Sequence, residues 1–590
     1  MIRISGLCLF LVSILWTTGR LQAEESARTA FSQLLDEAWE FELREDPLLA
    51  TQSGDHRYND LLPHMSLADV ARRQQVRQGF LDRLAEIDRD QLSPSEQVDY
   101  AIFARKLTDA KQEFRFQSHL TPVSNRSGLH TRFPDLPKRV PLKTTDDYEN
   151  YIARLGGFTA YVAGHIELMR SGLRNDVTQP AVIFDSFRGP LEAQVVDDPT
   201  ASVLYEPLKA LPSTVPEADH DRLRAGAREA IATSVVPGFR RLLQFMEQEY
   251  VPHCRGSIGA SGLPEGREFY RYRTRHFTTL DISPEDVHQI GLREVARIRG
   301  EMEEIIRAVG FAGDFAAFTE KLRTDPQFYA QTEEEFLQHV ALILKRMDGR
   351  LPELFGLLPR TPYGLKPIPD YIAPQATAAY YMPPTGDGTK AGIYYLNTYD
   401  LPSRPLYTAE ALALHEAVPG HHLQSTLQQE IENLHGYRKQ HWITAFGEGW
   451  ALYAERLGLE VGFYEDPYSD FGRLTMEMWR ACRLVVDTGL HYFGWTRAQA
   501  IEYLHENSAM SLLNIRSEVD RYIGWPGQAL AYKMGELKIR DLRAEAEGQL
   551  AERFDVRSFH DVVLGSGCVP LDVLQENVQA WIERQQMLTE

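Results

Sequence analysis

Two short segments carry residues suited to binding a metal and activating water: His415-Glu416 with His421, and Glu448 further along the chain. A neutral imidazole binds Zn²⁺, and a neighbouring carboxylate can take a proton from a zinc-bound water. We therefore predict that His415, His421 and Glu448 bind Zn²⁺ and that Glu416 is the general base. The fourth zinc position would hold water.

The spacing of the histidines differs from the His-Glu-x-x-His pattern, in which two ligands four residues apart share a helical face. His421 follows His415 by six residues, which places it roughly 240° around an ideal helix. His422 returns to the same face, but about 10.5 Å further along the axis. Pro419 interrupts helical hydrogen bonding and Gly420 permits most backbone conformations. We predict a bulge or break that brings His421 toward His415, with His422 as the alternative ligand.

A second predicted helix, from Phe446 to Glu455, supplies the third ligand. Glu448 and Glu455 are seven residues apart and lie on nearly the same helical face. We predict that Glu448 binds the metal and that Glu455 orients a ligand histidine through a hydrogen bond. Thr408 is expected to cap the helix that carries His415.

The elements around these motifs are mostly helical, because apolar residues recur at helical spacing through most of the chain. Ser283 and Pro284 predict the start of one such helix. The main exception is the stretch 376–397, where aromatic and β-branched residues flank a Pro/Gly turn. This pattern predicts a β-hairpin just before the first metal-binding motif.

The N-terminus resembles a secretory signal peptide, with Arg3, an apolar run from Leu7 to Trp16, and Ala23 at a small-residue cleavage site. The run is about half of the roughly 20 residues that span a bilayer, and Cys8 inside it argues against a lipoprotein. We expect a signal peptide at 1–23, a periplasmic or secreted location, and no membrane contact after cleavage. The mature chain is expected to form an N-terminal helical half, 24–250, and a catalytic half, 251–590.

The charge and the cysteines exclude two classes of site. The formal net charge is -20, and loss of Arg3 and Arg20 would take it to about -22, which argues against nucleic acid as a partner. Cys254, Cys482 and Cys568 form no Cys-x-x-Cys spacing, so a thiolate zinc site is excluded. A disulfide among them stays open. The sequence does not indicate an oligomeric state.

Several motifs resemble a bacterial family known as domain of unknown function 885: His415 to Gln424, Glu448 to Glu455, Gly291 to Ile298, Asp487 to His491, and Trp525 to Gly535. The resemblance spans nearly the whole mature chain. That family is grouped with gluzincin metallopeptidases, and its pattern is similar to thimet oligopeptidase, angiotensin-converting enzyme and carboxypeptidase Taq.

The resemblance implies a large, mainly α metallopeptidase-like fold with a deep central channel and a small β-sheet near the active site. In the related enzymes a Gly-His pair closes the first motif, so Gly420-His421 favours His421 over His422 as ligand. A two-residue insertion before Gly420 departs from their pattern and leaves the second ligand open. The sheet would bind an extended peptide along an edge strand in the predicted hairpin, with Tyr394 and Tyr395 as substrate contacts.

A zinc peptidase also needs donors for the oxyanion of its tetrahedral intermediate. Tyr532 is the first candidate for this donor and His491 is the second. The alternative for Tyr532 is a purely structural place in the protein core. Three cations are candidates for binding a substrate carboxylate: Arg483, Arg521 and Lys533. As the alternative, Arg480, Arg483 and Asp487 lie at helical spacings that also suit ordinary ion pairs.

Together these residues predict a zinc-dependent peptidase that hydrolyses short peptides, as a carboxypeptidase or an oligopeptidase. One alternative is a metal-dependent amidase or cell-wall peptide hydrolase. Another is a non-catalytic peptide-binding protein on a peptidase scaffold, against which Glu416 argues because a binder needs no base. Endo- versus exopeptidase action stays open, because it depends on what blocks the ends of the channel.

Overall fold

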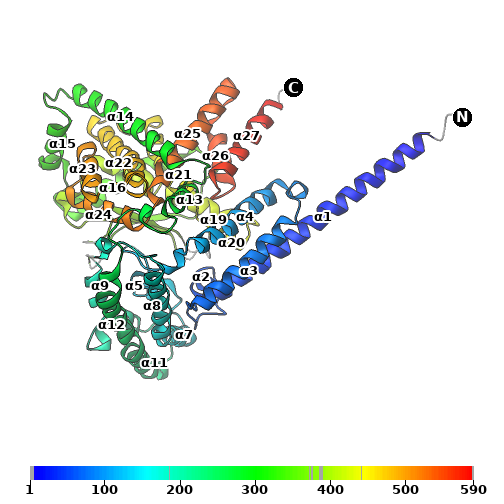
Figure 1. The fold of residues 1–590 in the computed structure, drawn as a ribbon. Helices are drawn as coiled ribbons and strands as arrows, with labels where there is room; N and C mark the ends of the chain where they lie inside the picture. The colour runs from blue at the N-terminus through cyan, green and yellow to red at the C-terminus, as the bar shows by residue number, and fades with distance from the viewer. Residues whose placement is uncertain are drawn as a thin grey trace. The chain divides into compact units, whose positions relative to one another are not determined.

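The computed structural model describes residues 5–125, 127–184, 187–370, 373, 376–384, 390–439 and 441–587, with side chains from residue 24 onward. The side chains of the expected signal peptide, 1–23, lie outside the described residues. The chain divides into two compact units, Met1–Cys254 and Arg255–Glu590. Both are helical, which confirms the mainly α fold class (Figure 1). Among the described residues, no helix is long and apolar enough to cross a membrane.

The first unit contains helices only, within its described residues. Its helices are α1 Ser5–Glu45, α2 Pro47–Gln52, α3 Leu67–Ala85, α4 Pro94–Arg115, α5 Leu129–Arg132, α6 Leu136–Arg139, α7 Thr145–Gly156, α8 Phe158–Arg174, α9 Arg188–Glu192, α10 Glu206–Lys209, α11 Glu217–Ala230 and α12 Val236–Phe245. Its apolar core includes Phe158, on which Phe133 stacks and against which the ring of Phe239 is tilted. None of the predicted site residues belongs to this unit.

The second unit carries all of the predicted site residues. Before the site it has α13 Gly266–Thr278, α14 Pro284–Ala308, α15 Phe315–Thr324, α16 Glu333–Asp348, α17 Leu351–Leu354, β1 Tyr363–Pro367, β2 Ala379–Met382 and β3 Gly392–Leu396. Then follow α18 Ala409–Glu416, α19 His421–Glu430, α20 Gly436–Lys439, α21 Thr444–Leu457, α22 Pro467–His491, α23 Arg497–Asn507, α24 Leu512–Gly524, α25 Ala531–Leu550, α26 Val556–Gly565 and α27 Leu571–Met587.

Helix α22 is the centre of this unit. From Phe471 to His491 every residue is buried except Trp479, and α14 packs along it (Figure 1). A helix buried on all sides normally carries apolar residues, yet α22 buries several charged ones. These buried residues are Arg473, Glu477, Arg480, Arg483, Asp487 and His491. These side chains therefore need partners inside the protein.

Local signals explain where some of these helices begin. As predicted, Pro284 opens α14 and the Ser283 hydroxyl accepts a hydrogen bond from the Asp286 N–H at 3.1 Å. Thr408 stands at the N-cap position of α18, but the capping prediction was wrong. Its hydroxyl donates to the Pro405 carbonyl at 3.0 Å and accepts no hydrogen bond from the helix.

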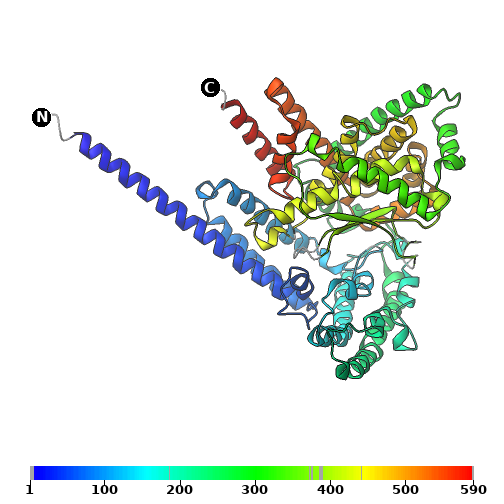
Figure 2. The same ribbon diagram turned by 180° about the vertical axis from the view of Figure 1, so that it is seen from behind.

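The predicted hairpin is present as the antiparallel pair β2 and β3, seen beside the yellow-green helices in Figure 2. Its turn, 385–389, lies outside the described residues. A third strand, β1, pairs in parallel with β3 and was not predicted. The order β1-β3-β2 makes β3 the central strand, so an edge strand in the hairpin can only be β2. The main chain of Tyr394 and Tyr395 is paired on both sides.

Candidate metal centre

The chain breaks between His415 and His421 into two separate helices. Helix α18 ends at Glu416, the Val418–Pro419 peptide bond is cis, and α19 begins at His421. The break follows from Pro419, which cannot donate to the preceding turn. A Cβ at Gly420 would collide with the carbonyl oxygens of Leu414 and His415, so only glycine fits there. Of the two predicted distortions, bulge or break, the structure has the break.

Helix α21 holds this break in place from the other side. The indole N–H of Trp450 donates to the Pro419 carbonyl at 2.8 Å. Helices α21 and α25 cross at Gly449 and Gly535, where neither position has room for a side chain. Glu448 precedes this crossing directly, so its place relative to the break is fixed by packing.

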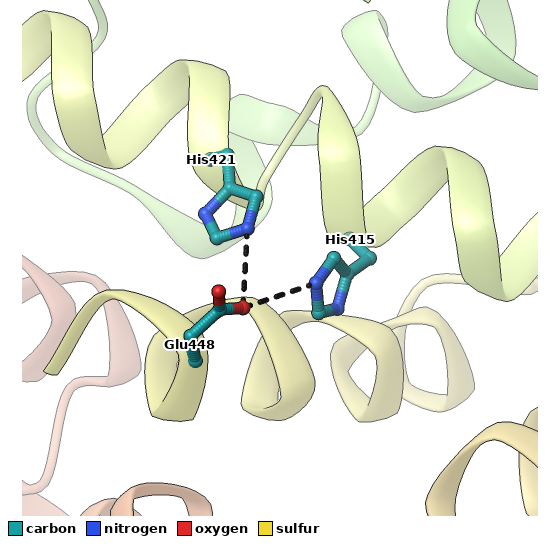
Figure 3. Close-up of side chains that lie close together, drawn as sticks. All are labelled: His415, His421 and Glu448. Atoms are coloured by element: carbon teal, nitrogen blue, oxygen red, sulfur yellow. Dashed lines mark ion pairs between the residues drawn. The ribbon is translucent and has the colours of Figure 1, made fainter. Parts of the chain in front are cut away.

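His415, His421 and Glu448 converge on one point (Figure 3). Nε2 of His415 lies 3.6 Å from Oε2 of Glu448, and Nε2 of His421 lies 3.4 Å from the same oxygen. Two ligands at 2.0–2.1 Å from a tetrahedral metal lie about 3.4 Å apart. All three ligand atoms are within 4.8 Å of one another. The three side chains therefore fit the donor set of a zinc ion with one open position.

Glu455 contacts Nδ1 of His415, the ring nitrogen that faces away from Glu448, as predicted. Its Oε1 lies 2.7 Å from His415 Nδ1, which leaves Nε2 directed at the convergence point. Arg480 Nη2 lies 3.6 Å from the same carboxylate oxygen. A carboxylate behind a ligand histidine fixes the tautomer and strengthens the ligand. His421 differs, because its Nδ1 is buried with no hydrogen-bond partner among the described residues.

The electrostatics of the three ligands match a cation site. Burial opposes the charge of Glu448, but the two imidazoles hold the pKa of this carboxyl well below its usual value. Burial likewise opposes charge on His415, yet Glu448 and Glu455 raise the pKa of this histidine to about 9. The cluster thus attracts positive charge, here protons, at the position where a metal would sit.

His422 points away from this cluster and toward the sheet. Its Nδ1 lies 2.8 Å from the Tyr381 hydroxyl of β2 and 3.2 Å from the Thr426 hydroxyl, and its ring packs on Tyr363 of β1. Burial lowers the pKa of His422 to about 4. Of the two candidate second ligands, the structure brings His421 to Glu448 and leaves His422 joining α19 to the strands.

Glu416 and Tyr394 lie beside the predicted ligands. Glu416 is the last residue of α18, directly after His415, and is 9% exposed. Tyr394 is fully buried, its hydroxyl has no hydrogen-bond partner among the described residues, and burial together with the charge of Glu416 raises its pKa. Tyr395 stacks on Tyr380 at 4.9 Å between ring centres. The Tyr394 side chain is therefore fully buried in the interior, whereas the Tyr395 side chain is half-buried on the sheet.

Three of the residues predicted beyond the metal lie together. The Arg483 guanidinium stacks over the Tyr532 ring at 4.3 Å, and the charge of Arg521 is stabilised by both Glu518 and Tyr532. Arg480, which sequence reasoning treated as an ordinary ion-pairing residue, lies between this group and Glu455. The only sequence signal for Arg480 is its spacing from Arg483 on one helix.

Two further predicted residues have other roles. Lys533 is completely buried among Glu477, Glu536 and Glu294, at 2.7, 2.8 and 3.0 Å, and so has no donor left for a substrate. His491 uses both ring nitrogens on main-chain groups: Nδ1 accepts from the Ala260 N–H and Nε2 donates to the Tyr522 carbonyl, each at 2.9 Å. The predictions of a substrate-binding Lys533 and a catalytic His491 are therefore corrected to structural roles.

The chain belongs to the family described as bacterial protein of unknown function (DUF885), which its residues 47–578 match. No curated protein matches the chain. The family identification agrees with the resemblance of the metal-binding motifs. It assigns no activity.

Two solved structures, each of a protein described as a putative lipoprotein, share the fold. The protein from Colwellia psychrerythraea is 29% identical, with a TM-score of 0.90 over 95% of this chain and 100% of its own. The protein from Shewanella oneidensis, of unknown function, is 18% identical, with a TM-score of 0.67 over 92% of this chain and 99% of its own. Nearly the whole fold is thus common to these bacterial proteins.

Proposed function

We propose that the protein is a zinc-dependent peptidase of the gluzincin type that hydrolyses short peptides. The observation that carries the proposal is the convergence of two imidazoles and a carboxylate from three helices, with Glu416 directly after the first histidine. When bound, Zn²⁺ would lower the pKa of a water ligand and polarise a substrate carbonyl. Two histidines and one glutamate are the ligand set of several zinc peptidases.

The side chains around the ligands support the individual roles. His415 and His421 present their Nε2 atoms, and Glu455 holds His415 in the tautomer that binds a metal. Glu416 accepts the proton of the attacking water and passes it to the leaving amine. Tyr532 donates a hydrogen bond to the oxyanion, with its ring held by the stacked Arg483 guanidinium. The outer strand β2 offers main-chain groups to an extended peptide.

We further propose that the protein acts outside the cytoplasm, after cleavage of a signal peptide near Ala23. The N-terminal sequence supports an exported protein, and the structural neighbours from Colwellia and Shewanella are described as lipoproteins. An extracytoplasmic location suits the turnover of peptides that are taken up or released from the cell envelope.

Two measurements on purified protein test the activity. Elemental analysis should find one zinc per chain, and Glu416→Gln should retain that zinc while losing at least about 10²-fold in turnover of a mixed peptide library. Glu334→Gln, the same change at an exposed position of α16, is the matched control and should turn over normally. Protein without stoichiometric zinc, or an unchanged rate in Glu416→Gln, would overturn the proposal.

A further inference from the structure

Three arginines on two helices meet around one tyrosine beside the metal centre. Arg480 and Arg483 come from α22, Arg521 comes from α24, and Tyr532 lies at the start of α25. The Arg483 guanidinium lies over the rings of both Trp479, at 4.2 Å, and Tyr532, at 4.3 Å. We call these four residues, Arg480, Arg483, Arg521 and Tyr532, the arginine cluster.

The arginine cluster has donors without acceptors. Arg480 Nε, Arg483 Nη1, and Arg521 Nε and Nη2 are buried and have no hydrogen-bond partner among the described residues. Arg480 and Arg483 are each 3% exposed, so bulk water does not solvate these groups. An unpaired buried donor is destabilising, and more so when it is charged. Buried polar groups in native proteins normally have a hydrogen-bond partner, so several unpaired donors in one place call for one.

The cluster is also short of negative charge. Arg483 and Arg521 share one carboxylate, Glu518, at 3.1 and 3.3 Å. Arg480 reaches Glu455 at 3.6 Å, but that carboxylate is already bonded to His415. Burial lowers the pKa of Arg480, and the positive charge of Arg483 lowers it further. An anion placed among these guanidinium groups would therefore be strongly stabilised.

The cluster is reachable from solvent on one side. Trp479 and Tyr532 are partly exposed, and the Arg521 side chain is 11% exposed. On the other side, Arg480 connects the cluster to Glu455 and so to the ligand His415. An anion entering at Tyr532 would thus be one arginine and one glutamate away from the metal ligands.

We propose that Arg483 and Arg521 bind the free C-terminal carboxylate of the peptide, which makes the substrates unblocked peptides cleaved near their C-terminus. This inference rests on the proposed peptidase function. The planar fork of a guanidinium matches a carboxylate with two parallel hydrogen bonds. Nη1 of Arg483 and Nη2 of Arg521 have no hydrogen-bond partner among the described residues, and Nε of Arg521 has only its 3.3 Å ion pair with Glu518. Arg480, between the two sites, holds Glu455 and keeps the carboxylate and the scissile bond at a fixed separation.

The test measures binding in the Glu416→Gln protein, whose turnover should be at least about 10²-fold slower, by titration calorimetry with three N-acetylated alanine peptides. One has a free C-terminus, the second is its C-terminal amide, and the third is an amide with an internal glutamate. The free acid should bind about 10- to 100-fold more tightly than either amide, since it alone pairs with the guanidinium groups. Equal affinities, or tight binding of the glutamate peptide, would overturn the assignment.

Conservative variants test whether Arg483 and Arg521 are the side chains that bind the C-terminal carboxylate of the peptide. Arg483→Lys and Arg521→Lys keep a charge near Glu518 but lose the fork, so the preference for the free acid should fall about tenfold. Arg473→Lys is the matched control: it is a buried arginine of the same helix whose guanidinium is satisfied by Asp470 and Glu477. It should keep the full preference. An unchanged preference in both test variants would exclude the cluster.

Failure of this inference differs from failure of the peptidase proposal. If the wild type hydrolyses the free acid and its amide equally well, the peptidase stands and the carboxylate site falls. If the free acid binds selectively but no peptide is cleaved by the zinc-loaded wild type, the anion site stands and the catalytic proposal falls. With the wild type, the released fragment also gives the number of residues removed.

Discussion

Helix α22 buries two clusters of charge that differ in how completely they are paired. Lys533 pairs with three carboxylates, those of Glu294, Glu477 and Glu536. Each of these carboxylates also forms at least one ion pair with an arginine. Arg297, Arg473 and Arg540 supply these contacts. We call this set the closed cluster. Lys533 itself has three carboxylates for its three donors.

The arginine cluster, one to three turns further along the same helix, is open by comparison. Four of its guanidinium nitrogens have no hydrogen-bond partner among the described residues, and neither does one carboxylate oxygen of Glu455, which serves both Arg480 and His415. Both clusters include buried arginines of α22, so burial of charge alone does not separate them. The clusters differ in unsatisfied donors rather than in buried charge as such, and these donors are the observation on which the proposed carboxylate site rests.

The largest expected effect comes from breaking the closed cluster. Lys533→Met leaves three buried carboxylates without their shared cation, and should lower the free energy of unfolding by about 3–5 kcal/mol, measured by chemical denaturation. Arg521→Met should lower it less, because it removes donors that mostly lack a protein partner. Lys538→Met, a partly exposed change on the same helix, should stay within about 0.5–1 kcal/mol. Equal losses at Lys533 and Arg521 would abolish the distinction between the clusters.

The next largest effect concerns Asp487 of α22 and the pH dependence of stability. Within the described residues, only one of the two carboxylate oxygens of Asp487 accepts hydrogen bonds. Its Oδ1 accepts from the Tyr270 hydroxyl at 2.6 Å and the Gly527 N–H at 2.9 Å, while Oδ2 has no hydrogen-bond partner in the described part of the chain. Burial raises the pKa of this carboxyl to about 7, against about 3.9 in an unfolded chain. Between these values the folded protein keeps a proton that the unfolded chain has lost. The stability contributed by this group therefore falls as pH rises from about 4 to 7.

Asp487→Asn should remove this loss. Asn keeps an oxygen for the two donors and never ionises, so the variant should gain about 2–3 kcal/mol over the wild type between pH 5 and pH 8. Unfolding titrations of both proteins at the two pH values measure the difference. A difference that stays constant across this range would show that Asp487 is ionised in the folded protein and is paired as fully as the closed cluster.

The sequence predicted the parts of the site that depend on local chemistry. Pro419 and Gly420 indicated that the helix after His415 is interrupted, and the break indeed brings His421 to Glu448. The seven-residue spacing likewise placed Glu455 next to Glu448 on one helical face, facing His415. These outcomes follow from residues within one or two helices. They need no knowledge of distant packing.

What the sequence did not predict depends on contacts between distant segments. The partners of His491 include the main chain of Ala260, and Lys533 pairs with Glu294, more than two hundred residues away in each case. Strand β1 was missed because it is short, contains Gly364 and ends in Pro367, and pairs in parallel with a strand beyond a long connection. Residue type could not tell a buried structural lysine from a substrate-binding one.

The smallest expected effect tests the link between the open cluster and the metal. Glu455→Gln keeps an oxygen for His415 Nδ1 but removes the charge that strengthens this ligand and pairs with Arg480. We expect the zinc dissociation constant to rise by about 10- to 100-fold, measured by competition with a chelator.

Glu460→Gln is the control for that change. It neutralises a glutamate just beyond α21 that pairs with Arg543 at 2.7 Å, without contact to a ligand histidine. Its zinc affinity should equal that of the wild type. If Glu455→Gln also binds zinc like the wild type, Glu455 does not act through His415. The arginine cluster would then be coupled to the metal centre by proximity alone, and its carboxylate preference should survive in the Glu455→Gln variant.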